Sequence, residues 1–439
     1  MSYSVSEAGS PSTAQAVAKN VEDAIYARVT RRLLPLLVIC YAVSYLDRVN
    51  VSFAKLQMAA DLHLSDTVYG FGAGIFFIGY VLAEVPSNLL LHRVGARRWI
   101  ARILITWGLL SAAMIYVSSP ISFYCLRFLL GVAEAGFLPG VLYYLMQWYP
   151  STRRGSITSK LYIGSALSGV IGGPLSGLIL SRFGGVSGLA GWQWMFLIEA
   201  LPAVALGVIV FFTLNDRIAD AKWLSDEEKA ILEHNVTFEE KGKDHIPVSA
   251  VFRSRHVWFL SAVLFLLVMG QYGIYFWMPT MVKESGVHDT LLIGLMTAIP
   301  YAVAIVVMTL VGRMSDRRGD RRFYLFTFAI IGAAALVGAV SVSTRPEVVL
   351  LALTVSTAAS MTMLPIFWTF PPAVLKGRAA AAGIALVNSL GVTAGFVAPY
   401  MIGALRDLTG KPASGMYVLA ACWLTASVLG LKLRSDKHG

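Results

Sequence analysis

Long apolar segments recur along almost the whole chain, and they constrain its fold more than any other feature. A helix that crosses a bilayer needs about 20 mostly apolar residues, and twelve such segments can be placed on the sequence with short polar breaks between them. Because 56% of the residues are hydrophobic and only 14% are charged, the sequence predicts an all-α membrane protein with twelve transmembrane helices. The expected starts are near residues 31, 68, 98, 120, 155, 192, 256, 290, 321, 346, 377 and 412.

The basic residues are distributed unevenly between the two sets of loops. With the N-terminus inside, 28 of the 36 Lys and Arg residues fall on the inner side and 6 on the outer side. An excess of positive charge in the inner loops is typical of membrane proteins. We therefore expect both termini in the cytoplasm and the spans in the inner (plasma) membrane. The net charge of +11 then reflects topology, and we expect no nucleic-acid partner.

Other classes of protein find little support in the sequence. The polar segment 1–30 lacks the apolar core of a signal peptide and is expected to be a disordered cytoplasmic tail. Cys40, Cys125 and Cys422 all fall within predicted spans, which argues against a disulfide framework or a metal cluster. The sequence also has no phosphate-binding glycine loop and no metal-ligand spacing, so we expect neither an enzyme nor a bound cofactor.

The longest polar stretch between spans separates two groups of six. Within it, Ser225 and Glu228 have the spacing of a helix capping box, so a short surface helix is expected to start there. The predicted organisation is an N-terminal six-helix bundle over residues 31–214, a cytoplasmic linker over 215–255, a C-terminal six-helix bundle over 256–433 and a cytoplasmic tail over 434–439.

The two halves resemble each other in the loop after their second span. GRMSDRRGDRR (residues 312–322) follows the eighth span, and NLLLHRVGARR (residues 88–98) follows the second. Many secondary transporters are built from such repeats, with the substrate site near the bilayer midplane between them. Glycines also recur in the fifth and eleventh spans, where they let helix backbones approach closely. These glycines are Gly169, Gly173 and Gly177, then Gly391, Gly395 and Gly403.

These motifs carry a family resemblance. GRMSDRRGDRR resembles the loop motif of the major facilitator superfamily, although Asn88 and His92 replace the first glycine and the acid in the first-half copy. YLDRVNVSFA, RFLLGVAEAGFLPG and AAGIALVNSLG are similar to segments of its anion:cation symporter branch, whose members carry sugar acids, tartrate, phthalate and other carboxylates, typically with protons. The resemblance implies two pseudo-symmetric six-helix bundles. The implied gating residues are Asp316, Arg317, Arg321, Arg93 and Arg97.

Charged residues lie inside predicted spans of the first half, where each costs about 2.5 to 3.5 kcal/mol. Asp47 and Arg48 are adjacent in the first span, and Arg127 and Glu134 lie two turns apart in the fourth. Adjacent residues on a helix project about 100° apart, so Asp47 and Arg48 should find separate partners. We expect Asp47 to meet Arg127 in at least one state and Arg48 to point into a central cavity.

These four charges suggest a division of roles. Arginine stays charged and its planar fork fits a carboxylate, so Arg48 is the expected substrate ligand. Burial favours the neutral form of a carboxyl group and a nearby guanidinium favours the charged form, so Asp47 and Glu134, with Arg127 nearby, are expected to take up and release protons. The family resemblance implies the same roles. The alternative is an ion-pair network that only holds two helices together. Glu199, near the outer end of the sixth span, is expected to be structural.

Neutral polar and aromatic groups take the place of charges in the second half. Its spans hold no charge near their centres, and amide, hydroxyl and indole groups there suit the non-ionic part of a ligand. A single aromatic residue is nevertheless more often a packing residue than a ligand contact. The resemblance places the residues at 271, 368 and 388 at positions that face the cavity. The expected contacts to the substrate body are Tyr45, Tyr80, Gln271, Tyr272, Trp368 and Asn388.

The resulting prediction is a monomeric, proton-coupled symporter that imports a small organic anion by alternating access. Moving one elementary charge against an inside-negative potential costs about 2.3 kcal/mol per 100 mV, and two or more co-transported protons would reverse that cost for a monoanion. Tartrate-like, phthalate-like and sugar-acid substrates all stay open. An exporter or exchanger of metabolites or drugs on the same fold is one alternative, and a non-transporting membrane sensor is another.

Overall fold

The computed structural model describes residues 13–237, 253–341, 344–371 and 379–433. Within these ranges, eleven helices are long and apolar enough to cross a membrane. A shorter apolar helix, α17 (Ser414–Gly430), supplies a twelfth. The expected all-α fold with twelve spans is therefore confirmed.

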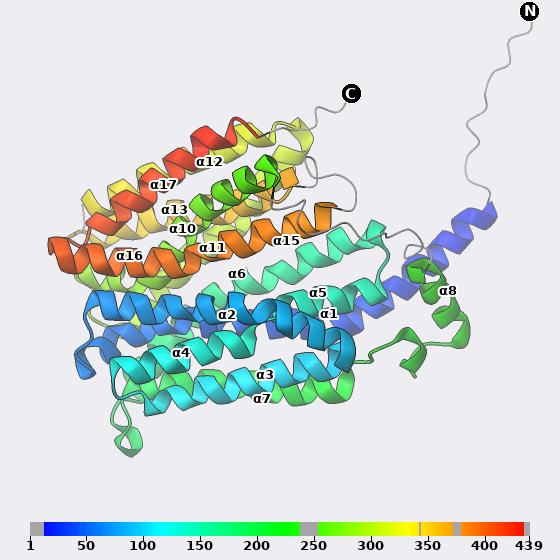
Figure 1. The fold of residues 1–439 in the computed structure, drawn as a ribbon, viewed down its shortest axis with the longest axis horizontal. Helices are drawn as coiled ribbons and strands as arrows, with labels where there is room; N and C mark the ends of the chain where they lie inside the picture. Colours follow the sequence, from blue (N-terminus) through cyan, green and yellow to red (C-terminus); the bar gives the residue numbers. More distant parts are fainter. Residues whose placement is uncertain (1–12, 238–252, 342–343, 372–378, 434–439) are drawn as a thin grey trace, which may run out of the picture.

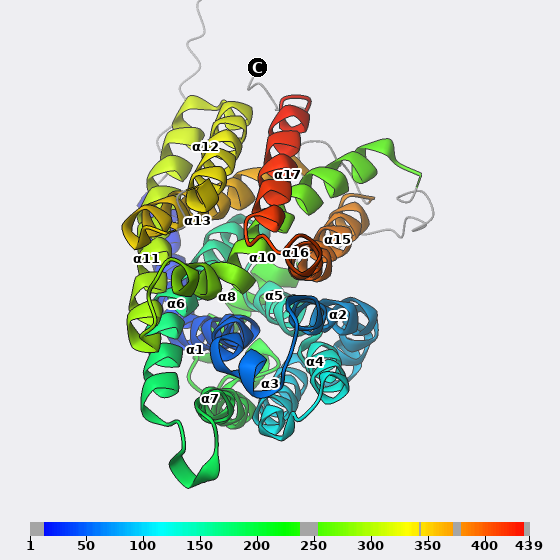
Figure 2. The same ribbon diagram turned by 90° about the vertical axis from the view of Figure 1, so that its left-hand side faces the viewer.

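The spans form two groups that follow the order of the chain (Figure 1). The first group lies below the second in both Figure 1 and Figure 2. The first group contains α1 (Thr13–Asp61), α2 (Asp66–Val94), α3 (Ala96–Ala112), α4 (Pro120–Glu134), α5 (Phe137–Trp148), α6 (Ser151–Arg182) and α7 (Gly191–Thr213). The second contains α10 (Arg255–Glu284), α11 (Thr290–Arg318), α12 (Arg321–Ser341), α13 (Pro346–Phe367), α15 (Ala379–Val392), α16 (Ala394–Thr409) and α17.

The first helix starts earlier than the sequence predicted. The disordered tail expected over residues 1–30 is wrong from Thr13 onward, where α1 begins. Ile25 and Tyr26 on this extension are buried, and the Tyr26 ring stacks on Tyr149 with centroids 5.8 Å apart. Burial of apolar side chains stabilises the extension. The surfaces that cover them come from distant parts of the chain, so local sequence gave no sign of it.

The segment between the two groups begins with the expected surface helix. The hydroxyl of Ser225 accepts a hydrogen bond from the Glu228 backbone N–H at 3.2 Å, and the Glu228 carboxylate accepts one from the Ser225 N–H at 3.0 Å. The predicted capping box is therefore confirmed, and it starts α8 (Asp226–Thr237). Glu228 also pairs with Arg28 of α1 at 2.9 Å. Residues 238–252 of the predicted linker lie outside the described ranges.

Among the described residues, two helix pairs make the most extensive contacts between the groups, and glycines allow both contacts. Helix α6 packs against α11, and α2 packs against α16. A Cβ atom on Gly173 would lie 2.6 Å from the carbonyl oxygen of Gly294, and one on Gly403 would lie 2.1 Å from that of Asp66. Side chains do not fit at these distances. The predicted close approach of helices at these glycines is confirmed, and it takes place between the two halves of the molecule.

Candidate functional site

A buried ion pair joins α1 to α4. The Nε and Nη2 atoms of Arg48 lie 2.7 and 2.6 Å from Oε1 of Glu134. Arg48 is 8% exposed and Glu134 is completely buried. Arg48 was predicted to point into a central cavity, and the structure shows its guanidinium held by an acid. A ligand carboxylate that approaches Arg48 must therefore compete with Glu134 for the same guanidinium.

A break in the fourth span sets the position of Glu134. Helix α4 ends at this residue, and α5 begins at Phe137 because Gly136 has a φ of +84°. Glycine adopts this left-handed conformation without the penalty that other residues pay. The hydroxyl of Ser87 on α2 donates a hydrogen bond to the freed carbonyl oxygen of Ala135 at 2.6 Å. The segment EAG thus ends the helix and leaves the Glu134 carboxylate facing α1.

Asp47 has a different set of partners from Arg48, as the helix geometry predicted. Its Oδ1 atom accepts hydrogen bonds from the amide of Asn50 at 3.0 Å and from the hydroxyl of Ser111 on α3. The expected ion pair with Arg127 does not form in this conformation, because α1 turns the Asp47 carboxylate toward α3. The structure leaves open the expectation that the two meet in another state.

Arg127 is completely buried and incompletely paired. Its Nη2 atom donates to the carbonyl oxygen of Ala73 at 3.2 Å, whereas Nε and Nη1 have no hydrogen-bond partner among the described residues. The guanidinium lies over the ring of Phe76, 5.1 Å from its centroid. Asp47 and Glu134 both act electrostatically on its charge. Arg127 is thus a buried cation with spare donors close to both acids.

Aromatic rings surround the Arg48 guanidinium. Its Cζ atom lies 5.2 Å from the ring centroid of Tyr45, 5.1 Å from that of Tyr80 and 5.7 Å from that of Phe76. Aromatic faces attract a cation most strongly where water is excluded. Tyr45 and Tyr80 were both predicted as substrate contacts, and the structure places both beside the predicted anion ligand.

One predicted substrate contact of the second half, Tyr272, packs directly against the first half. The Tyr272 ring lies 4.6 Å from the ring of Phe77 on α2, measured between centroids. Gln271 donates a hydrogen bond to the hydroxyl of Tyr275 at 3.2 Å, within α10. Trp368 and Asn388 are half-buried. No hydrogen bond joins these second-half residues to Arg48 within the part of the chain that the structure describes.

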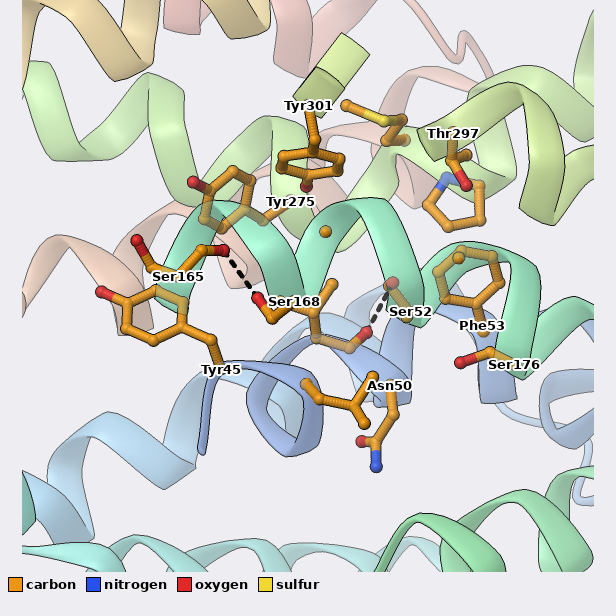
Figure 3. A pocket seen from close by; sticks show the side chains of 17 residues that line it. Tyr45, Asn50, Ser52, Phe53, Ser165, Ser168, Ser176, Tyr275, Thr297 and Tyr301 are labelled. Carbon is orange, nitrogen blue, oxygen red and sulfur yellow. Dashed lines mark hydrogen bonds between the residues drawn. The ribbon is translucent and has the colours of Figure 1, made fainter. Parts of the chain in front are cut away.

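A pocket lies between the halves, next to this charged region (Figure 3). Helices α1 and α6 line one side of it, and α10 and α11 line the other. The predicted contact Tyr45 belongs to its lining, whereas Arg48, Tyr80, Gln271, Tyr272, Trp368 and Asn388 do not. Polar residues that were not predicted from the sequence also line the pocket. They include Asn50, Ser165, Ser168, Ser176 and Thr297. In this conformation the pocket and the Arg48 ion pair are therefore neighbouring but separate features.

The loop motif of the first half makes a contact within its own half. Arg97 donates its backbone N–H to Oδ1 of Asp216 at 2.8 Å, and its Nε lies 3.5 Å from Oδ2. Asp216 follows α7, so this contact stays in the first half. Arg93 and Arg317 are exposed, Arg321 is half-buried, and the side chain of Asp316 lies outside what the structure describes. The gating role of these residues stays a prediction.

An ion cluster that the sequence analysis did not identify bridges the halves at one end. Asp66 on α2 accepts from Lys55 at 2.7 Å and from Nε of Arg406 at 2.8 Å. Arg406 on α16 also pairs with Glu284 of α10. The Lys55 Nζ atom lies 3.6 Å from the ring centroid of Trp277. We call Lys55, Asp66, Glu284 and Arg406 the end cluster, and the loop charges predict that this end faces outward.

Neutralising the end cluster should open this end of the molecule. In Arg406→Gln, Asp66 and Glu284 lose a shared cation, so the closed arrangement loses stability relative to the open one. We expect a cysteine introduced at the buried Met281 to react about tenfold faster with a maleimide, which corresponds to about 1.4 kcal/mol. Lys411→Gln, an exposed lysine at the same end, is the matched control. Equal labelling rates in Arg406→Gln and Lys411→Gln would show that the cluster does not hold this end closed.

The fold and the midplane charges define a class of protein. Two six-helix bundles that meet along glycine-rich helices, with charges buried inside the first bundle beside a pocket between the halves, are the architecture of a secondary transporter. A family model described as the Major Facilitator Superfamily matches residues 37–399. The chain therefore belongs to the Major Facilitator Superfamily.

Its relatives are transport proteins rather than enzymes. NicT of Pseudomonas putida, named provisionally as a metabolite transport protein, is 47% identical over 413 residues, which cover 93% of this chain and 94% of the relative. A protein of Agrobacterium vitis named provisionally as a tartrate transporter is 45% identical and covers 94% and 95%. A quinolone resistance transporter of Acinetobacter baumannii is 42% identical and covers 93% and 94%. The spans and these bacterial relatives make the chain a multi-pass inner-membrane protein.

Solved structures of transporters share the fold. A bacterial homologue of the human lysosomal transporter Spinster, in an inward-facing and occupied conformation, is 16% identical with a TM-score of 0.74, and the match covers 91% of this chain and 96% of that one. A D-xylose-proton symporter is 15% identical with a TM-score of 0.71, and the match covers 92% and 98%. At these identities the likeness establishes the fold alone.

Proposed function

We propose that the protein is a proton-coupled symporter that imports a small organic anion by alternating access. The observation that carries this proposal is the buried pair of Arg48 and Glu134 between α1 and α4. An arginine that one acid already holds can bind a carboxylate substrate only when that acid gives it up. Protonation of Glu134 removes its charge, so a proton on this acid and an anion on Arg48 favour each other. Coupling between proton and substrate follows from this shared partner.

Asp47 and Arg127 supply the second part of the proposed mechanism. Each is buried, and each keeps polar atoms without a hydrogen-bond partner among the described residues. When Glu134 is protonated, the positive charge of Arg127 loses one of its two nearby acids, which favours a closer approach of Asp47. We expect this exchange of partners as the halves rock, with the end cluster closing one end while the other opens.

The name of one relative agrees with an organic anion as substrate. One relative is named for tartrate, which carries carboxylates, and Arg48 offers the planar fork that binds such a group in two places. Tyr45 and Tyr80 beside it, and Tyr272 from the second half, are positioned to contact the rest of a small ligand. We propose Gln271, Trp368 and Asn388 as further contacts once the halves separate.

Uptake into proteoliposomes tests the proposed function. The protein would be offered labelled tartrate, an aromatic carboxylate, a sugar acid and an uncharged sugar, each with and without an inward proton gradient. We expect accumulation of at least one acid that depends on the gradient, and no uptake of the sugar. Uptake of the uncharged sugar equal to that of the acids would contradict the anion assignment. Accumulation of an acid that does not depend on the proton gradient would contradict proton coupling.

One relative favours a second candidate function. The quinolone resistance transporter suggests export of a drug on the same scaffold. Inverted vesicles distinguish the two possibilities, because an exporter driven by proton exchange would accumulate a fluoroquinolone inside them when their lumen is acidic. We expect no such accumulation, since release of Arg48 by a proton on Glu134 makes the proton and the anion move in the same direction.

A further inference from the structure

Several buried oxygen atoms of the first half lack a hydrogen-bond partner within the described part of the chain, and three of them belong to neighbouring side chains of α1 and α7. They are Oδ2 of Asp47 and Oδ1 of Asn50, both on α1, and Oε2 of Glu199 on α7. Glu199 is only 1% exposed. Its other oxygen accepts a hydrogen bond from the hydroxyl of Ser176 at 2.6 Å. The polar side chains that act on its carboxyl group are Ser176, Asp47 and Asn50.

All three atoms are hydrogen-bond acceptors, and buried acceptors normally have a donor as a partner. An ionised carboxylate that is buried without a cation costs several kcal/mol, so such a group is normally neutral. A proton on Oε2 of Glu199 would turn that atom into a donor, and the Asn50 carbonyl oxygen is an acceptor without a partner. The Asn50 amide nitrogen already donates to Asp47. One proton on Glu199 would therefore serve both groups when Oε2 and the Asn50 oxygen meet.

Within the described ranges, the helices packed around Glu199 place no cationic side chain beside its carboxyl group. Helix α7 packs on α1, α3 and α6, and Asp47 on α1 is the titratable group that acts on Glu199. The backbone of Ala200 meets Gly108 of α3, whereas the arginines of α3 lie within its first seven residues, at the opposite end. Helix α6 contributes Ser176 here, and Arg182 stands at its exposed end. Glu199 thus faces a second acid rather than a base.

Glu199 also has a route to the space between the halves. Ser176, which donates to Glu199, and Asn50, which donates to Asp47, both line the pocket between α1, α6, α10 and α11 (Figure 3). When the carboxyl proton lies on Oε1 and the Ser176 hydroxyl turns to accept it, the proton can leave through this hydroxyl to water in the pocket. The Asn50 amide can then turn over, so that its N–H₂ donates to the Glu199 carboxylate and its oxygen faces Asp47. Asp47 then takes up a proton in exchange for the one that Glu199 released to the water, and this proton satisfies that oxygen.

We propose that Asp47 and Glu199 share one proton through Asn50, which makes Glu199 a proton-binding group of the transport cycle alongside Asp47 and Glu134. This inference rests on the proposed symport and adds an acid to it. It also replaces the expectation that Glu199 is purely structural. The ligand is a proton, and no covalent step is involved, because the hydrogen moves between carboxyl oxygens and the pocket water.

Infrared spectroscopy of the purified protein tests the protonation of Glu199 without relying on transport. We expect the carbonyl band of a protonated, buried carboxyl group at neutral pH, and we expect Glu199→Gln to remove it. Ser176→Ala deletes one hydrogen bond and little volume, so it should shift the frequency of the band. This variant provides the test if Glu199→Gln folds poorly. Glu227→Gln, an exposed acid on α8, should leave it unchanged. A band that persists in Glu199→Gln and does not move in Ser176→Ala would overturn the proposal.

Proteoliposome transport then tests the shared proton. Glutamine at position 199 imitates the protonated acid permanently, so Asn50 can no longer turn over. We expect counterflow of substrate to continue and accumulation driven by the proton gradient to be lost. Accumulation equal to that of Glu227→Gln would overturn the role of Glu199 in coupling. If wild-type protein shows the infrared band but no proton-driven uptake at all, the proposed function fails while the protonation of Glu199 stands.

Discussion

Replacing Arg48 with alanine is expected to abolish uptake of the organic anion. Truncating one partner of a buried charge pair costs about 2 to 5 kcal/mol, and each 1.4 kcal/mol corresponds to a factor of about ten in affinity. Both the substrate carboxylate and Glu134 depend on this guanidinium. We therefore expect initial uptake of the labelled acid to fall by about 100-fold or more.

Two further variants separate binding from folding. Arg48→Ala alone leaves the Glu134 carboxylate buried without a cation, which destabilises the protein as well. The double variant Arg48→Ala, Glu134→Gln leaves no unpaired charge, so it should recover thermal stability but not uptake. Arg48→Lys keeps the charge and loses the planar fork, and we expect it to retain weak uptake. Recovery of uptake in the double variant would show that Arg48 only stabilises the fold.

Replacing Glu134 with glutamine should separate exchange from accumulation. Glutamine cannot ionise, so Arg48 would no longer be held by an acid and no proton would be needed to release it. We expect substrate counterflow to persist, while accumulation driven by a proton gradient falls to the level set by the membrane potential alone. The measurement is uptake of the same labelled acid with and without the gradient.

The matched control for this variant is Glu347→Gln, which changes an exposed acid at the start of α13. It should accumulate substrate as the wild type does. Wild-type accumulation in Glu134→Gln as well would leave the ion pair of α1 and α4 with a structural role only, which is the alternative that the sequence allowed.

The sequence was sufficient to predict the spans and the separation of Asp47 from Arg48. Twelve apolar segments follow from hydropathy, and different partners for adjacent charges follow from the 100° between neighbouring residues on a helix. The pairing itself was not predictable. It depends on where the backbone break at Gly136 leaves Glu134, and on which face of α1 meets α3 and which meets α4.

The end cluster shows a second limit of sequence reasoning. Asp66 and Arg406 are 340 residues apart, and each stands near the end of a span, where charges are common. No local motif marks them as partners. Glu199 is a similar case, because its place near the end of a span suggested a structural role. Its unpaired oxygen, and the unpaired oxygens of Asp47 and Asn50, become visible only when the helices are packed together.

Proton movement that accompanies substrate uptake gives the most direct test of coupling. The protein would be placed in lightly buffered proteoliposomes without an imposed proton gradient, and potassium with valinomycin would hold the membrane potential at zero. The transported acid would then be added while the external pH is recorded. The external solution should become more alkaline as protons enter with the anion, and Glu134→Gln should not produce this change. Substrate entry in the wild type with no change in external pH, or with acidification, would contradict proton-coupled import.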